Sequence, residues 1–195
     1  MIALVLGGAA CRWDDVDRLE AMVGSPWPGI VIGVNEACCK PDSYGRGWTR
    51  RFDALATLHT EKVVRWKHAR RQFVRSLGRS PLWDHYEVWG HTNRSAVDRN
   101  FHGWPGGSSG LYAVSVALEM GAAGVVVCGC PIDDQDNAFR GERWHAFKRY
   151  RKGWKKQRRL GGLERVRSMS GWTAELCGEP DREWLGEGVS QPSAA

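Results

Sequence analysis

Residues 108–129, SSGLYAVSVALEMGAAGVVVCG, contain a helix and a strand in direct succession. Two serines that can cap a helix come first, and apolar residues then recur at helical spacing. The run GVVVCG at 124–129 is continuously apolar and rich in valine, which is typical of a strand buried on both faces. A buried helix that leads directly into such a strand predicts an α/β protein with a parallel sheet.

The alternation of strands and helices extends over the rest of the chain. Besides 124–129, short apolar runs predict strands at 2–6, 30–34, 52–58, 86–89 and 165–169. Helical spacing, capping residues and terminal glycines predict helices at 14–24, 60–78, 111–120, 142–160 and 173–176. This order favours a Rossmann-like, doubly wound, mostly parallel sheet of about six strands with helices on both faces. We expect a single domain over 1–185 and a flexible tail over 186–195.

Length and composition narrow the class of protein. The 195 residues, 42% of them hydrophobic, suit one globular domain. No apolar run reaches the roughly 18 residues that a membrane helix needs, and the opening MIALVLGGAA lacks the basic leader of a signal peptide. We therefore expect a cytoplasmic protein without membrane contact. The six cysteines do not have the usual spacing of a zinc site and are expected to be reduced thiols.

Positive charge is concentrated in one stretch of the chain. Residues 140–167 hold 12 Lys and Arg against two acidic residues, a local charge of +10, whereas the rest of the chain carries −4. Lys and Arg alternate with aromatic residues there, so the helix should bury an aromatic stripe and expose a basic face. Such a face indicates a phosphate-bearing partner or ligand, and a merely solvated helix is the alternative. The candidate contacts are Arg143, Lys148, Arg149, Arg151, Lys152 and Lys155.

The ends of the first two strands carry candidate ligand contacts. In doubly wound sheets a ligand binds beyond the carboxyl ends of the strands, near the point where the strand order reverses. Gly7 and Gly8 follow the first strand, where small residues either let backbone amides approach an anion or pack a strand tightly against a helix. Asn35 follows the second strand, where its amide suits a base edge or a sugar hydroxyl, or else a turn.

The loop 104–110, WPGGSSG, is the most informative of these strand-to-helix connections. Its glycines permit unusual backbone angles, and its serines can cap the helix and offer hydroxyl groups. It is not a P-loop, because it contains no Gly-Lys-Ser/Thr. Ser108, Ser109 and Gly110 are therefore expected either to contact a nucleotide or to begin a well-capped core helix.

An acidic loop and a histidine follow the strand at 124–129. Asp134 and Asp136 form a D-x-D pair whose oxygen atoms suit Mg²⁺ or Mn²⁺, although carboxylates in such a loop can also be simply solvated. His145 stands near the start of the basic helix, where an imidazole could act as a general base, and five other histidines compete for that role.

Taken in order, these pieces resemble the family 42 bacterial sialyltransferases. Residues 108–129 resemble the central motif of that family, in which Ser-Gly begins a helix, Leu-Gly closes it and a strand ends in Gly. The stretch LGGAAC at 6–11 lies where the family has a Gly-Asn-Gly-Pro-Ser loop, and Asn35 matches the asparagine after its second strand. The run RVRSMSGW at 165–172 is also similar to small uncharacterised phage and prophage proteins.

The resemblance implies a glycosyltransferase with a CMP- or UDP-linked sugar donor. It places Asn35, Ser108, Ser109 and Gly110 near the nucleotide, and it gives His145 the role of the base that deprotonates the acceptor hydroxyl. Combined with the basic helix, it predicts a phage-type enzyme of the host cytoplasm whose acceptor is a modified base in DNA.

Two other hypotheses remain open at this point. A non-catalytic nucleic-acid-binding or virion-associated protein would bind DNA with a steep salt dependence and without regard to nucleotides. A nucleotide pyrophosphate-transfer enzyme would use Asp134 and Asp136 to hold magnesium, and its nucleotide binding would need the metal.

Overall fold

One parallel sheet forms the centre of the protein. The computed structural model describes residues 1–24, 26–39, 46–79, 85–92, 95–104, 106–134, 136–139, 141, 143 and 145–189. All strand pairings in this part of the chain are parallel, in the order β5-β4-β3-β2-β1-β6-β7. The seven strands are β1 (Ile2–Leu6), β2 (Ile30–Val34), β3 (Ala54–Thr57), β4 (Glu87–Gly90), β5 (Arg99–Asn100), β6 (Gly124–Cys128) and β7 (Val166–Ser168).

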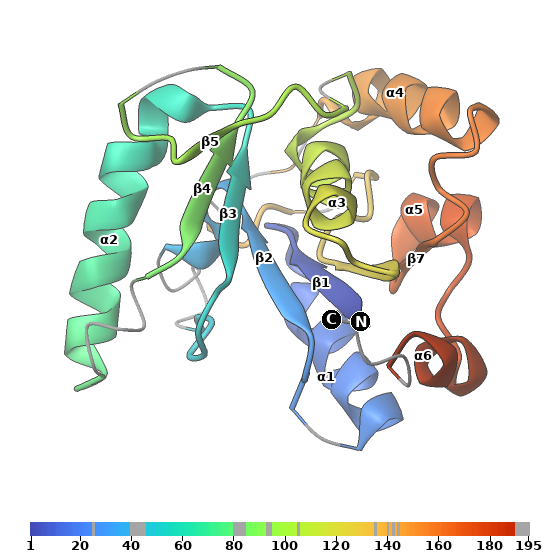
Figure 1. Ribbon diagram of the computed structural model, residues 1–195, viewed down its shortest axis with the longest axis horizontal. Coiled ribbons are helices and arrows are strands. Elements are labelled where there is room, and N and C mark those ends of the chain that lie inside the picture. The colour runs from blue at the N-terminus through green and yellow to red at the C-terminus, as the bar shows by residue number, and fades with distance from the viewer. Residues whose placement is uncertain are drawn as a thin grey trace.

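Helices cover both faces of the sheet, which confirms the doubly wound prediction (Figure 1). Successive side chains of a strand point to opposite faces, so Leu4 and Leu6 belong to one buried cluster, and Ala3 and Val5 belong to the other. The first cluster packs against α1 (Arg12–Val23), α2 (Val63–Ser76) and α6 (Arg182–Val189). The second packs against α3 (Ser109–Glu119), α4 (Phe147–Arg159) and α5 (Gly171–Cys177). Two short 3-10 helices, η1 (Asn35–Cys38) and η2 (Thr60–Lys62), complete the described elements.

The strand order reverses between β1 and β6. From β1 the chain steps outward to the edge strand β5, and α3 then leads back to β6 on the other side of β1. Leu6 is paired with Cys128, so the carboxyl ends of these two strands are level. The loops that leave β1 and β6 are therefore neighbours at the switch point, where a ligand is expected.

The structure departs from the predicted elements mainly at short or late segments. β5 was not predicted, because two exposed residues carry no hydrophobic period. The basic helix begins at Phe147 rather than at 142. α6 extends to Val189, four residues into the segment expected as a tail, because Asp181 caps it and Leu185 is buried; residues 190–195 lie outside the described part. Among the described helices, none is long and apolar enough to cross a membrane.

Candidate functional site

Gly7 and Gly110 meet the same side chain at the switch point, the thiol of Cys130. A Cβ atom on Gly7 would overlap Cys130 Sγ and the carbonyl group of Gly129, and one on Gly110 would lie 2.9 Å from Cys130 Sγ. The two glycines thus allow the end of β1, the start of α3 and the end of β6 to approach one another. Tight packing, which was one of the two expectations for Gly7, accounts for both glycines.

The backbone after β1 is hydrogen-bonded within the chain. Ala9 N donates to Gly129 O at 3.0 Å, and Ala10 N donates to Asp136 O at 2.9 Å. The segment 136–139 lies along this loop, where Ala138 N donates to Gly8 O at 2.9 Å. The amides of Ala9 and Ala10 are therefore engaged by the protein itself. An anion contact through these amides, one of the two expectations for this loop, is not what the structure shows.

A buried carboxylate joins three elements at the switch point. Asp15 of α1 is 2% exposed. Its Oδ2 atom accepts hydrogen bonds from Gly129 N at 2.8 Å, from Ser170 Oγ at 2.7 Å and from the Cys11 thiol at 3.6 Å. An Asp in the first turn of the helix after β1 is the signal that could have pointed to it.

Burial governs the protonation of this cluster. It raises the pKa of Asp15, and the hydrogen bonds from Gly129, Ser170 and Cys11 oppose that rise. Burial also raises the pKa of Cys11 to about 12, with the nearby charge of Asp15 as the next cause, so this thiol stays neutral. The cluster is suited to holding α1, β6 and β7 together and not to nucleophilic chemistry.

The raised pKa of Asp15 predicts a protein that loses stability as the pH rises. A carboxyl group whose pKa is higher in the folded state binds more protons there, so the free energy of unfolding falls as the pH passes from the ordinary Asp value up through the raised one. Asn cannot ionise, so we expect the Asp15→Asn variant to lose this part of the pH dependence of the free energy of unfolding. Urea unfolding between about pH 4 and about pH 7 measures it. Asp14→Asn, at an exposed neighbour, should keep the wild-type pH dependence, and the same dependence in Asp15→Asn would contradict the prediction.

Asn35 leaves β2 in a left-handed conformation with a φ of 54°. Its Oδ1 atom accepts a hydrogen bond from Thr57 Oγ1 at 2.7 Å, and Thr57 Oγ1 accepts one from His59 N at 2.8 Å. Because Oδ1 is bound to Thr57, the Nδ2 group with its two donors is turned away from Thr57. This half-buried amide is held in one orientation at the carboxyl edge of the sheet.

Ser108 caps α3 and also supports α4. Its Oγ atom accepts hydrogen bonds from Leu111 N and from Trp154 Nε1, each at 3.2 Å. Gly153 lies so close to the backbone of Gly106 and Gly107 that a Cβ atom would collide with it. α4 therefore rests on the start of α3, and the cap is the role that the structure gives to Ser108. Ser109 is half-buried in the first turn.

Arg151 differs from the other cations of α4 because it lies against the loop after β6. Its Nε atom donates to Ile132 O at 3.0 Å. Its guanidinium group lies 5.1 Å from the ring centre of Phe147 and 4.8 Å from that of Trp172. Ile132 has a φ of 51°, which is unusual for a β-branched residue and turns its carbonyl group toward Arg151. The result is a half-buried cation in a defined position at the carboxyl edge.

The remaining candidates lie in solvent. Asp134 is exposed, with its Oδ2 atom 3.6 Å from Arg143 Nη1, and Asp136 and His145 are exposed as well. No three His, Cys, Asp or Glu side chains in the described ranges form a group that could hold a metal ion, so Asp134 and Asp136 are not joined there by a third side chain of these types. The exposed basic face of α4 consists of Lys148, Arg149, Lys152, Lys155, Lys156, Arg158 and Arg159.

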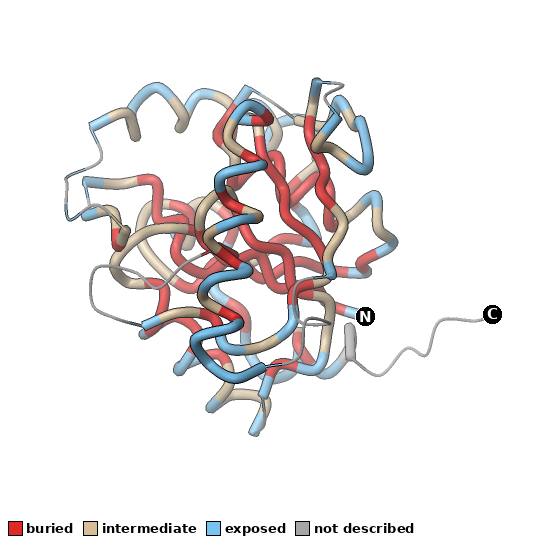
Figure 2. Tube along the Cα trace, turned by 90° about the vertical axis from the view of Figure 1, so that its left-hand side faces the viewer, coloured by how far each residue is buried: buried red, intermediate tan, exposed pale blue. Residues whose placement is uncertain are grey.

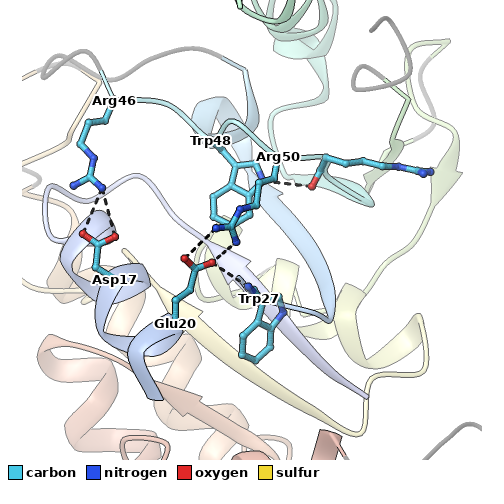
Figure 3. A network of polar contacts seen from close by, with 7 residues as sticks. Asp17, Glu20, Trp27, Arg46, Trp48 and Arg50 are labelled. Atoms are coloured by element: carbon cyan, nitrogen blue, oxygen red, sulfur yellow. Dashed lines mark hydrogen bonds and ion pairs between the residues drawn. The ribbon is translucent and has the colours of Figure 1, made fainter. Parts of the chain in front are cut away.

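A cavity of about 350 Å³ lies elsewhere, on the face covered by α1 and α2. The four charged side chains that line it are paired, Asp17 with Arg46 at 3.4 Å and Glu20 with Arg50 (Figure 3). Trp48 forms an aromatic wall between α1 and α2. Because the two members of each pair neutralise each other, the cavity offers no net charge to a ligand. We therefore assign no ligand to it.

Comparisons with known proteins bear on the fold. No protein-family model and no curated protein matches the chain. Among solved structures, the chain is similar to the sialyltransferase CST-II in complex with a trisaccharide acceptor and CMP. The match has a TM-score of 0.56 and 12% identity, and it covers 93% of this chain and 87% of the other. The chain has a sialyltransferase-like fold. The fold implied by the sequence motifs is thus confirmed over nearly the whole length.

Proposed function

We propose that this protein transfers a sugar from a CMP- or UDP-linked donor at the carboxyl edge of its sheet. The observation that carries the proposal is the similarity, over 93% of the chain, to a sialyltransferase in complex with CMP. Two positioned groups at the same edge support it, the Nδ2 group of Asn35, which is turned away from Thr57, and the guanidinium group of Arg151. Ligands of doubly wound sheets bind at this edge.

Each residue has a defined part in the proposed reaction. Asn35 donates to the base or the ribose, with Gly7, Gly8 and the start of α3 at Ser108, Ser109 and Gly110 beside the nucleotide. His145 takes the proton of the acceptor hydroxyl as its oxygen bonds to the anomeric carbon. The bond from that carbon to the donor phosphate breaks with inversion, and Arg151 stabilises the negative charge of the departing nucleotide.

The exposed basic face of α4 supports a nucleic acid as the acceptor. Seven Lys and Arg side chains reach solvent there, with no acidic residue in the helix. Such a surface binds phosphate without regard to base sequence, and a modified base in the bound DNA would supply the acceptor hydroxyl. The resemblance of residues 165–172 to phage and prophage proteins supports a phage-type enzyme.

A thermal-shift panel tests the proposal directly. The protein is melted with CMP, CDP, UMP, UDP, GDP and NAD, each with and without magnesium. A ligand at about 100 times its Kd stabilises the fold by roughly 2.7 kcal/mol, which raises the Tm of a chain of this size by roughly 5–10 °C. We expect a selective shift with a cytidine or uridine nucleotide, and magnesium dependence tests the predicted role of Asp134 and Asp136. The absence of any shift contradicts the proposal.

Substitutions at Asn35 separate its backbone role from its binding role. Asn35→Gly and Asn35→Ala both remove the amide, but only glycine adopts a φ near 54° without strain. We expect the alanine variant to be less stable than the glycine variant by about 1 kcal/mol. Both should bind the selected nucleotide about tenfold more weakly, as expected for one lost hydrogen bond. Wild-type nucleotide affinity in both variants would exclude Asn35 from the site.

A second candidate function is favoured by the same exposed basic face of α4. A non-catalytic protein would use it to bind nucleic acid without any turnover. Its binding to DNA would be steep in salt and unaffected by added nucleotides, whereas the proposed transferase should respond to its nucleotide. Titration of DNA with and without each nucleotide distinguishes the two.

A further inference from the structure

Two buried thiols converge on the carbonyl group of Asn35, and the proposed function does not use them. Cys38 ends η1 and Cys39 follows it, and these residues are 1% and 0% exposed. Their Sγ atoms lie 3.2 Å from each other. The thiol of Cys38 donates to Asn35 O at 3.4 Å, and the thiol of Cys39 donates to the same oxygen at 3.7 Å. We define the side chains of Cys38 and Cys39 as the thiol pair.

The thiol pair lies in the apolar cluster that α2 covers. η1 packs against α2 and against the end of β2. Figure 2 shows the buried strands behind α2, whose outer side is exposed. Gly33 of β2 leaves the room for this packing, because a Cβ atom on it would lie 2.5 Å from Cys38 Cβ. A thiol suits such a place, since it is small and largely apolar and still offers a weak hydrogen-bond donor.

Asn35 needs support from its surroundings because its backbone is left-handed. A residue with a Cβ atom is strained at a φ of 54°, and such a conformation persists where neighbouring groups hold it. Thr57 holds the side chain through Oδ1, and the thiol pair holds the carbonyl group. Burial raises the pKa of the Cys39 thiol, which therefore keeps the proton that it donates. Asn35 is thus fixed through its side chain and through its backbone.

We propose that Cys38 and Cys39 are positioning residues for the amide group of Asn35. They hold the backbone from which this side chain leaves, so that its Nδ2 group meets a ligand in one orientation. Two cysteines that only filled the core would respond differently to serine. A hydroxyl group donates to Asn35 O as a thiol does, whereas a purely apolar site accepts alanine better than a hydroxyl group. The inference rests on the proposed function only in taking a nucleotide as the ligand of Asn35.

The test compares two double variants of the thiol pair. Cys38→Ala with Cys39→Ala removes both donors, and Cys38→Ser with Cys39→Ser replaces them with hydroxyl groups. Titration calorimetry well below the Tm of each variant gives the affinity for the nucleotide selected in the thermal-shift panel. The alanine double variant should bind it about three- to tenfold more weakly, since the most that can be lost is the hydrogen bond of the Asn35 amide. The serine double variant should recover most of that affinity.

Cys177→Ala is the matched control, because it removes a buried thiol from α5, on the other face of the sheet. It should bind the nucleotide as the wild type does. In the Asn35→Gly background, the alanine substitutions at the thiol pair should leave the affinity unchanged, because the amide through which the thiols act is absent. A merely structural role of the thiol pair would weaken binding in both backgrounds.

The side-chain Nδ2 NMR signals of Asn35 test the positioning without any nucleotide. Their loss in Asn35→Gly identifies them. They should move in the alanine double variant and stay in place in the serine double variant and in Cys177→Ala. If the alanine double variant does not fold, Cys38→Ala and Cys38→Ser carry the same comparison.

Three results would overturn the inference. The Asn35 signals can stay in place in the alanine double variant, the serine double variant can bind more weakly than the alanine one, or the alanine substitutions can weaken binding equally in the Asn35→Gly background. Moved signals with unchanged nucleotide affinity would instead exclude Asn35 from the nucleotide site, which is a failure of the proposed function. Each of the two can therefore fail while the other stands.

Discussion

Replacement of His145 by alanine is expected to lower the rate of sugar transfer by about 10²- to 10⁴-fold, the usual contribution of a positioned general base. His145 is exposed in the turn before α4, so the loss of its ring removes little packing, and Tm should stay within about 1–2 °C of the wild type. The shift in Tm caused by the nucleotide should persist, because the proposed base acts on the acceptor and not on the donor. The rate is measured as release of the nucleotide selected in the thermal-shift panel from a sugar donor that carries it.

His102 supplies the matched control, since it is also an exposed histidine and follows β5 rather than β6. His102→Ala should transfer sugar at the wild-type rate. Full activity in His145→Ala would assign the base to another residue. A loss of nucleotide binding in His145→Ala would instead place the imidazole in the donor site.

Replacement of Trp154 by alanine is expected to lower the free energy of unfolding by about 3–5 kcal/mol, the usual cost of emptying a large buried site. Trp154 belongs to α4 and is fully buried in the apolar cluster on which this helix packs, and its Nε1 donates to Ser108 Oγ. For a chain of this size each kcal/mol corresponds to about 2–4 °C, so Tm should fall by roughly 6–20 °C. Denaturant unfolding gives the free energy, and thermal melting gives the Tm.

Two further substitutions, one at Trp154 and one at a control position, separate the contributions to this loss of stability. Trp154→Phe keeps most of the ring and loses the donor to Ser108, whose Oγ still accepts from Leu111 N, so we expect a smaller loss of about 1–2 kcal/mol. Leu160→Ala, at a position that is 67% exposed, should change the stability by less than about 0.5 kcal/mol. A Trp154→Ala protein as stable as Leu160→Ala would mean that α4 does not rest on the start of α3.

Much of the fold could be predicted because its central strands carry a local signal. β1 and β6 are continuous apolar runs, since a strand in the middle of a parallel sheet is buried on both faces. β2 was also predicted with its observed bounds. α6 was missed because its buried contacts, such as Leu185, lie in a short helix whose apolar residues show no clear period in the sequence.

The candidate site was less predictable than the fold. Asn35 and Arg151 were singled out from the sequence, but the groups that hold them, Thr57, Ile132 and Trp172, were not. Arg151 belongs to a dense run of cations, and nothing local distinguishes it from Lys148 or Lys152. Its partners come from the loop after β6 and from α5, so its position depends on how α4 packs.

The sequence by itself determined the alternation of strands and helices and the class of the fold, and from these the edge of the sheet where a ligand is expected. These follow from hydrophobic period, capping residues and terminal glycines, which act over a few residues. Only the tertiary structure decided which side chains meet there. Asp15 contacts Gly129 and Ser170 across 114 and 155 residues of chain. Contacts at such separations depend on the order and register of the strands and on the packing of the helices over them, which no local pattern contains.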